Sequence, residues 1–208
     1  MVATKAGSPY KSIKDVIAAA KANPGKLNFG SINPGSNQHL SGELFKSLAG
    51  IDATTIPFKT TPELLTAVLR GDVDIAFEYE AAMQGPLSDG QIIAIATTGR
   101  ERASSMPNVP TVAEGGVPDY DITSWNALAA PIKTPMEIVT LLNKEVNEAL
   151  KLPEVKAGAA RFGMEARGSG IDELRERIKR EVAQWAKVAE AADGLLVPTA
   201  LVAVTVHV

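Results

Sequence analysis

The chain has 208 residues, of which 45% are apolar and 5% aromatic, so it can bury a normal core in one domain or in two small lobes. Its formal net charge is -3 and its lysines and arginines are scattered, which argues against a nucleic-acid partner or an anionic membrane surface. It contains no cysteine, which excludes disulfides, thiolate metal sites and cysteine nucleophiles.

The N-terminus and the longest apolar runs bear on location. The stretch "MVATKAGSPYKS" lacks the charged and apolar regions of a signal peptide, and no run reaches the roughly 18 apolar residues of a membrane span. We expect the chain, if expressed as written, to stay in the cytoplasm.

Helix and strand patterns alternate over the first hundred residues. Helical apolar spacing follows residue 12, residue 36 and residue 61, and ends near residues 22, 50 and 71. Thr61 and Pro62 predict the cap and first position of the third helix. Runs typical of strands lie at residues 26–31, 53–58, 73–79 and 91–98. This alternation predicts an open, mostly parallel α/β sheet flanked by helices.

The second half of the chain has a different pattern of residues. A Pro-rich stretch, "MPNVPTVAEGGVPDYDITSWNALAAPIKTP", predicts an ordered crossover between structural units. Helical patterns follow at roughly residues 135–150, 153–162 and 171–191, the first with a capping box from Thr134 to Glu137. The C-terminal "LLVPTALVAVTVHV" is typical of a strand.

The loop "GSINPGSNQHL", residues 30–40, separates a predicted strand from a predicted helix. Gly30 and Gly35 would let the backbone approach a ligand, and Ser31 and Ser36 would offer hydroxyls. Free N–H groups and the helix dipole at residues 37–39 would favour a carboxylate. The alternative is that Ser36 only caps its helix while the glycines form a tight turn. The loop matches neither the P-loop nor the dinucleotide fingerprint.

Several stretches together resemble one protein family over roughly residues 8–190. They include "GSNQHLSGELFKSLAGID", "IPFKTTPELLTAVLRGDVDIAFE" and the "MPNVPTVAEGGVPDYDITSWNALAAP" connector with its "SW" pair. These resemble the tripartite tricarboxylate transporter substrate-binding proteins, the TctC or Bug family. The resemblance implies a periplasmic binding protein of type II, whose two α/β lobes close on a small carboxylate. It also implies membrane transporter subunits as partners, and no catalysis, cofactor or metal.

The resemblance implies a binding site at two strand ends. It places a carboxylate cradle at Ser31, Gly35, Ser36, Asn37 and His39. It places Phe58, Lys59, Thr60 and Thr61 at the second strand end, facing the cleft. Glu78 stands where many relatives carry Asp, so the far end of the ligand could be recognised differently.

Each of these assignments has a plainer alternative. Lys59 and Glu78 could be solvated surface charges, and His39 could serve only to cap its helix. We expect Trp125 and Trp185 to be core residues rather than platforms for a ligand.

Relatives carry about a hundred further residues before the position of residue 1, which include the opposite wall of the site. The C-terminal run resembles the crossover strand that precedes "MVATKAGSPYKS" in the family. We therefore expect a truncated, circularly permuted and engineered form, in which residues 197–208 pair in the same sheet as 26–31. The ligand-binding lobe would comprise residues 1–123 and 195–208, and residues 124–194 would form the crossover and C-terminal helices. We expect weak or no ligand binding, and possible homodimerisation through the exposed lobe interface.

Two other functions remain as alternatives. An enzyme could use Ser31 or Ser36 with His39, but no nucleophile elbow and no orienting acid accompany them. An effector-sensing domain of a LysR-like regulator would share the two-lobe design, but no helix-turn-helix is present.

Overall fold

Residues 1–191 are described by the computed structural model, in which the chain divides into two units at the bond between Ser124 and Trp125. Unit 1 is Met1–Ser124, and unit 2 begins at Trp125. The prediction that residues 195–208 complete the sheet of the first unit lies outside the described residues and stays a prediction.

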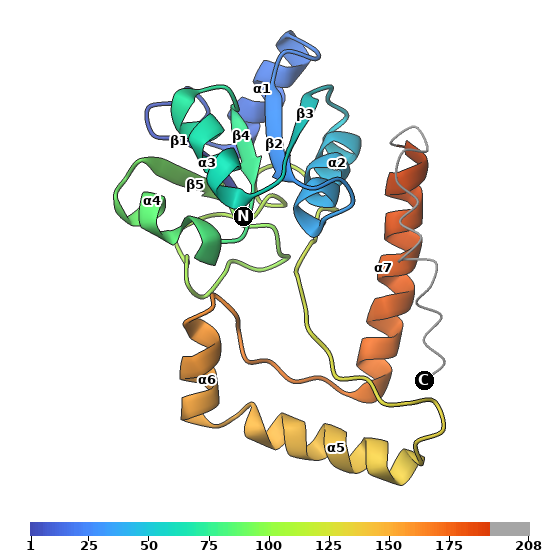
Figure 1. The fold of residues 1–208 in the computed structure, drawn as a ribbon. Helices are drawn as coiled ribbons and strands as arrows, with labels where there is room; N and C mark the ends of the chain where they lie inside the picture. The colour runs from blue at the N-terminus through green and yellow to red at the C-terminus, as the bar shows by residue number, and fades with distance from the viewer. Residues whose placement is uncertain (192–208) are drawn as a thin grey trace. The chain divides into compact units, whose positions relative to one another are not determined.

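Unit 1 is built on a five-stranded sheet. Its strands are β1 (Val2–Lys5), β2 (Asn28–Ile32), β3 (Thr54–Phe58), β4 (Ile75–Phe77) and β5 (Ile92–Ala96), in the order β3-β2-β4-β1-β5 (Figure 1). β2 is parallel to both β3 and β4, whereas β1 is antiparallel to β4 and β5. The predicted open, mostly parallel α/β sheet is therefore confirmed, with β1 as its one antiparallel strand among the described residues.

The helices of unit 1 begin where local capping signals lie. They are α1 (Ile13–Ala22), α2 (Asn37–Ala49), α3 (Thr61–Arg70), the single 3₁₀ turn η1 (Ala81–Met83) and α4 (Gln84–Ser88). Ser12 caps α1 and Ser36 caps α2, each through a hydroxyl that accepts a backbone N–H three residues later. Gly50 ends α2 in the left-handed conformation, with φ 60°.

The predicted cap of α3 was wrong by one residue. Thr60, not Thr61, has the extended backbone of an N-cap, and its hydroxyl accepts the N–H of Glu63. The hydroxyl of Thr61 instead donates to Glu78, 17 residues away, so a tertiary contact decides which threonine caps the helix.

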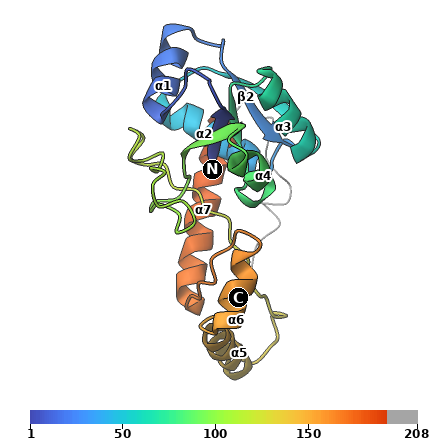
Figure 2. The same cartoon turned by 90° about the vertical axis from the view of Figure 1, so that its left-hand side faces the viewer.

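The core of unit 1 lies on both faces of the sheet, with α1 and α2 over one face and α3 and α4 over the other (Figure 2). On the α2 face the rings of Phe29, Phe45 and Phe77 lie 5.6 to 6.0 Å apart, and Tyr120 meets Phe45 edge-on. On the other face, Leu64 and its buried neighbours pack against β1, β4 and β5. Two packed faces hold the strand ends rigidly, which positions the site.

The Pro-rich connector is ordered, as predicted. Thr97, just after β5, donates its N–H to Pro110 and accepts the N–H of Val112. Arg102 binds the carboxylate of Glu114 through two nitrogens, and this pair lowers the pKa of Glu114 below its ordinary value. The connector therefore lies against the sheet before it reaches Ser124.

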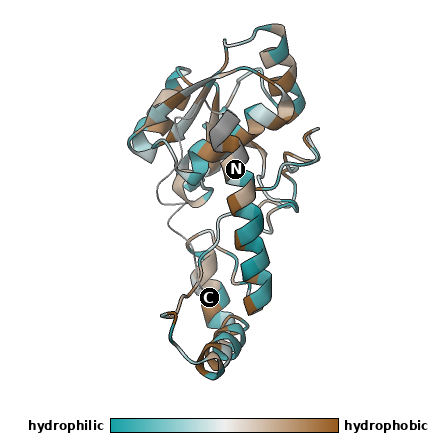
Figure 3. Ribbon diagram, turned by 90° about the vertical axis from the view of Figure 1, so that its right-hand side faces the viewer, coloured by the Kyte–Doolittle hydropathy of each residue, from teal (hydrophilic) through white to brown (hydrophobic). Residues whose placement is uncertain are grey.

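Unit 2 contains α5 (Met136–Ala149), α6 (Pro153–Ala160) and α7 (Ile171–Ala191), as the apolar spacing predicts. The predicted capping box is wrong, because Pro135 is the N-cap of α5 and makes no side-chain cap bond. These helices carry hydrophilic and apolar residues together (Figure 3). Among the residues described, no helix combines the length and apolar composition needed to cross a membrane.

Trp125 is not a core residue, in contrast to the prediction. Its side chain is 38% exposed, its Nε1 donates to Glu181 at 2.9 Å, and the guanidinium of Arg177 lies 5.7 Å from the ring centre. These contacts join the start of unit 2 to α7, so the indole is retained by polar and cation–π contacts rather than by burial. Trp185 is half-buried.

Candidate functional site

The predicted site residues of unit 1 lie at one edge of the sheet. β2, β3 and β4 are parallel neighbours, so their carboxyl ends meet at the same edge. Ser31 is the next-to-last residue of β2, Phe58 ends β3, and Glu78 follows β4 directly. Helices α2 and α3 both begin at this edge, which is where open α/β sheets place their ligands.

The loop before α2 is a tight turn that closes on the sheet. Asn33 donates its N–H to Phe58 O at 2.9 Å, and Ser36 donates its N–H to Asn33 O at 3.0 Å. The hydroxyl of Ser36 accepts the N–H of His39 at 3.1 Å and donates to Ile32 O. Gly35 has φ +82°, which a side chain would strain. Ser36 therefore caps α2, as the plainer alternative held.

The start of α2 still presents donors. Asn37 and Gln38 are the first two residues of the helix, so no residue inside the helix can accept their N–H groups. The partial positive charge of the helix N-terminus adds to them. These groups are the part of the predicted cradle that can hold a carboxylate.

Two buried polar atoms near this turn lack partners within the described residues. Ser31 is 2% exposed and its Oγ makes no hydrogen bond there; nor does Nδ1 of His39. Ser31 shares a face of β2 with Phe29, two residues earlier, which packs against Phe45 of α2. Its hydroxyl is therefore directed to the side of the sheet where α2 begins. A buried hydroxyl without a partner costs about 1–3 kcal/mol, so it favours a bound water or ligand.

His39 is held as a neutral imidazole. Burial lowers its pKa below the ordinary value of 6.5, although Glu43 acts in the opposite direction. Its Nε2 lies 3.9 Å from Glu43, too far for a hydrogen bond. His39 therefore adds no positive charge to the site at neutral pH.

Glu78 is a buried carboxylate that links neighbouring elements through hydrogen bonds. The alternative that it is a solvated surface charge is wrong. It is 3% exposed, and its carboxylate accepts from Gln38 Nε2 at 2.9 Å and from Thr61 Oγ1 at 2.9 Å. It also accepts the N–H of Tyr79 at 2.7 Å. One carboxylate thus ties the first turns of α2 and α3 to the end of β4. Sequence reasoning missed Gln38, because its partner lies 40 residues away.

A second chain of hydrogen bonds crosses the mouth of the site. Asn37 Nδ2 donates to Ser124 Oγ at 2.7 Å, and Ser124 Oγ donates to Tyr79 Oη at 3.0 Å. All three groups are at the surface. Sequence reasoning named Asn37 but missed Tyr79 and Ser124; the position of Tyr79 at the end of a predicted strand was the one signal that could have found it.

The residues after β3 complete the edge. Lys59 donates its N–H to the carboxylate of Glu63 at 3.1 Å, and Glu63 returns its N–H to Thr60, a reciprocal cap. The side chain of Lys59 is exposed, as the plainer alternative held, and Phe58 packs half-buried against the core. Lys59 is the only cation among the predicted site residues.

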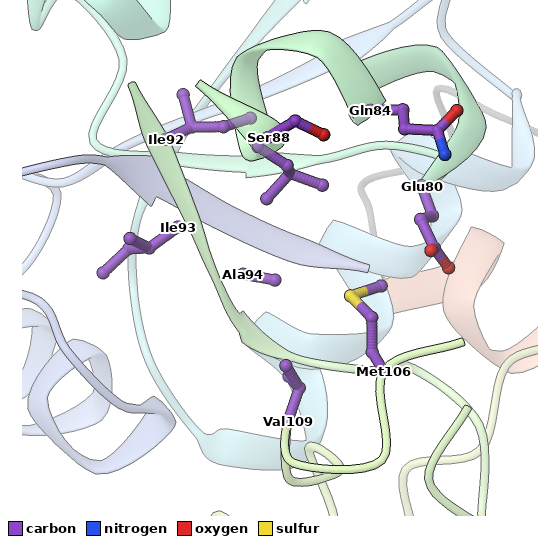
Figure 4. A pocket seen from close by; sticks show the side chains of 9 residues that line it. Glu80, Gln84, Ser88, Ile92, Ile93, Ala94, Met106 and Val109 are labelled. Carbon is purple, nitrogen blue, oxygen red and sulfur yellow. The ribbon is translucent and has the colours of Figure 1, made fainter. Parts of the chain in front are cut away.

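A pocket of about 470 Å³ lies elsewhere in unit 1, along β5 (Figure 4). Its walls come from β5, from α4 with the residues before it, and from Met106 and Val109 of the connector. None of the predicted site residues lines it. Among the described residues, no group of three or more His, Asp or Glu side chains could hold a metal ion.

The chain is similar to known proteins over most of its length. Residues 1–193 match the family model "Tripartite tricarboxylate transporter family receptor", TctC. BugT of Bordetella pertussis is 33% identical over 185 residues, which are 89% of this chain and 57% of that protein. The chain spans about half the length of BugT and of two other curated relatives that it matches.

Two solved structures are similar as well. Rpa4515 of R. palustris, solved with adipate, is 33% identical, with a TM-score of 0.76 over 93% of this chain and 64% of that one. MatC of Rhodopseudomonas palustris, solved with bound malate, is 27% identical, with a TM-score of 0.70 over 90% of this chain and 65% of that one. The resemblance found in the sequence is confirmed: this chain belongs to the tripartite tricarboxylate transporter family of receptors, a family of binding proteins and not of enzymes.

Proposed function

We propose that this chain supplies one lobe of a periplasmic solute-binding protein that captures a small carboxylate for a tripartite tricarboxylate-type transporter. The observation that carries the proposal is the sheet edge where α2 and α3 both begin, beside a buried Ser31 hydroxyl that has no partner within the described residues. The bound adipate and malate of two similar structures are carboxylates of the expected size.

The lobe binds without making or breaking a covalent bond. One carboxylate of the ligand accepts the N–H groups of Asn37 and Gln38, and the helix dipole favours its charge. The hydroxyl of Ser31 supplies a further donor, directly or through a water. Glu78 holds the two helix starts in register, and both of its carboxylate oxygens already accept hydrogen bonds from Gln38, Thr61 and the N–H of Tyr79.

Binding by this chain is weak, because a cleft binder surrounds its ligand from two sides. With one wall, fewer hydrogen bonds form and water is not excluded, so we expect a dissociation constant on the order of 1 mM or above. In the whole protein a second lobe would cover the ligand, and the closed form would be the one that membrane subunits of the transporter recognise.

An NMR titration tests the proposal. With ¹⁵N-labelled chain, malate and adipate should shift the amides of residues 31, 37 and 38 along saturable curves. Uncharged adipamide, and sodium chloride at matched ionic strength, should not. Carboxylates that shift these amides no more than the chloride control would refute the proposal.

Two variants of Asn37 separate the contribution of its backbone N–H from that of its side chain. Asn37→Ala removes the side chain and keeps the N–H, whereas Asn37→Pro removes both at a helix position that tolerates proline. Weaker binding in the proline variant than in the alanine variant, by about fivefold or more, assigns the difference to one N–H group. Equal binding in the two variants would show that this N–H is not part of the cradle.

We propose further that unit 2 joins two copies of this chain. Nine large apolar side chains there are 44% to 80% exposed: Leu128, Ile132, Met136, Ile138, Leu141, Leu142, Leu152, Phe162 and Met164. At roughly 100 Å² each they expose on the order of 1,000 Å² in total, an area comparable to one side of a stable dimer. Light scattering should give a dimer mass. Leu141→Glu should yield monomers and Leu48→Glu, on unit 1, should not; a monomeric wild-type chain would refute this proposal.

A further inference from the structure

Tyr79 is held by hydrogen bonds at its backbone N–H and at its phenol oxygen, beside the proposed carboxylate cradle. It lies two residues after the end of β4, and it is 43% exposed. Its backbone N–H is bound by the buried carboxylate of Glu78 at 2.7 Å. Its phenol oxygen accepts the hydroxyl of Ser124 at 3.0 Å, and Ser124 in turn accepts the side-chain amide of Asn37 at 2.7 Å. The ring is therefore two hydrogen bonds away from the first residue of α2.

A ring held in this way suits a ligand that also has a flat face. Aromatic side chains gain about 0.5–1.5 kcal/mol from stacked or edge-on partners beyond the area they bury. A side chain that is already immobilised loses little rotamer freedom on binding. A ligand whose carboxylate lies at Asn37 and Gln38 would extend its body past the mouth of the site, where Tyr79 and Ser124 meet.

The charges around Tyr79 point to the same class of ligand. Glu78 precedes Tyr79 in the chain and Glu80 follows it, whereas His39 is held neutral by burial. A second carboxylate directed toward Tyr79 would approach the like charges of Glu78 and Glu80, which is unfavourable at short range, whereas the cation Lys59 directly follows the end of β3. An uncharged body is not penalised in this way.

We propose that Tyr79 is a specificity-determining residue, and that the site selects monocarboxylates with a planar, aromatic or conjugated body over aliphatic dicarboxylates. This inference rests on the proposed carboxylate-binding function. It separates this chain from the similar structures solved with adipate and malate, whose ligands are flexible and carry two carboxylates.

The test compares benzoate with cyclohexanecarboxylate, which have the same charge and nearly the same size but differ in planarity. In NMR titrations of the full chain, benzoate should bind at least threefold more tightly than cyclohexanecarboxylate or adipate. Ring-current shifts should appear at residues 79 and 124. Tyr79→Ala should reduce the ratio of the two affinities to about one, Tyr79→Phe should keep most of it, and Leu48→Ala, an exposed control on α2, should leave it unchanged.

The outcomes are distinguishable. Equal affinity for benzoate and cyclohexanecarboxylate in the wild-type chain overturns the role of Tyr79, and so does a preference that survives Tyr79→Ala. In both cases the carboxylate cradle itself stands. Cradle amides that respond to none of the acids, malate and adipate included, overturn the proposed function and this inference with it. Amide spectra of each variant show beforehand that unit 1 is folded.

Discussion

Replacing Gly30 with alanine should destabilise unit 1, although alanine is the smallest side chain that could be added. A Cβ at this position would lie 2.4 Å from Leu64 Cδ1 and 2.8 Å from Val73 Cγ1, distances that real Cβ contacts do not show. Leu64 is 0% and Val73 is 1% exposed, and the β-branched valine has little rotamer freedom with which to yield. The added methyl group must therefore push α3 away from the sheet.

The magnitude follows from two opposing effects. Overpacking a filled core costs about 1–3 kcal/mol, and removing a glycine from a strand returns about 0.5–1 kcal/mol of chain entropy. The net loss is about 1–2 kcal/mol, which lowers Tm by about 2–8 °C in a chain of this size. Thermal unfolding followed by circular dichroism measures it.

Gly85→Ala is the matched control, because it makes the same chemical change in α4 where nothing lies within 4 Å of the added Cβ. It should be neutral or raise the free energy of unfolding by up to about 1 kcal/mol, since alanine favours helix. Opposite signs for the two substitutions support the packing argument. A Gly30→Ala chain as stable as the wild type would show that α3 does not constrain this strand, and the argument would fail.

Substitutions at two further positions, His39 and Glu78, test the buried polar groups. His39→Gln should flatten the pH dependence of stability. The pKa of His39 in the folded chain lies below 6.5, so as the pH falls the unfolded chain takes up a proton before the folded chain does. Wild-type stability should therefore fall as the pH drops from about 7 through 6.5 and on to the lowered pKa. Urea unfolding at several pH values measures this, and an equal slope in both proteins would contradict it. Glu78→Ala should cost about 2–4 kcal/mol by chemical denaturation, because it leaves the Gln38 amide and the Thr61 hydroxyl unpaired, whereas Glu78→Gln should cost less; equal losses would show that the bonds to Glu78 contribute little.

The regular elements of unit 1 were predictable because their signals are local. Ser12 and Ser36 cap helices from sequence positions where the hydroxyl reaches an N–H three residues later, and Gly50 ends α2 because it tolerates a left-handed backbone. Apolar spacing does the rest, since it identifies the face that must be buried. None of these signals depends on what the chain does elsewhere.

Two of the errors fall where a distant contact decides. Two threonines precede Pro62, and either could cap α3; the bond from Thr61 to Glu78 leaves Thr60 as the cap. Trp125 is of a residue type that is usually buried in the core. It stays near the surface because it contacts Glu181 and Arg177, which lie 56 and 52 positions further along the chain. Pairings at such separations are not visible in one sequence.

The candidate site shows the same division. The free N–H groups at the start of α2 were predictable because the first residues of any helix have no acceptor within it, whereas their role as a carboxylate cradle stays a prediction. Gln38, Tyr79 and Ser124 were missed, because their places depend on Glu78 and on the return of the connector to the sheet. A binding edge in an open sheet is assembled from several loops, and only the loops with unusual composition can be recognised beforehand.

The two glycines of the "GSINPGS" loop show why a recognisable motif and a binding site are not the same set of residues. Gly35 is required by its backbone, since φ +82° is strained for a side chain, whereas Gly30 is required by the helix behind it, which leaves no room for a Cβ. The packing of α3 against the sheet is therefore enough to require glycine at position 30. The motif is recognisable because two glycines with different structural roles stand close together in the sequence. Gly30 allows α3 to pack against the sheet, and Gly35 forms the turn that leads into the first N–H groups of α2.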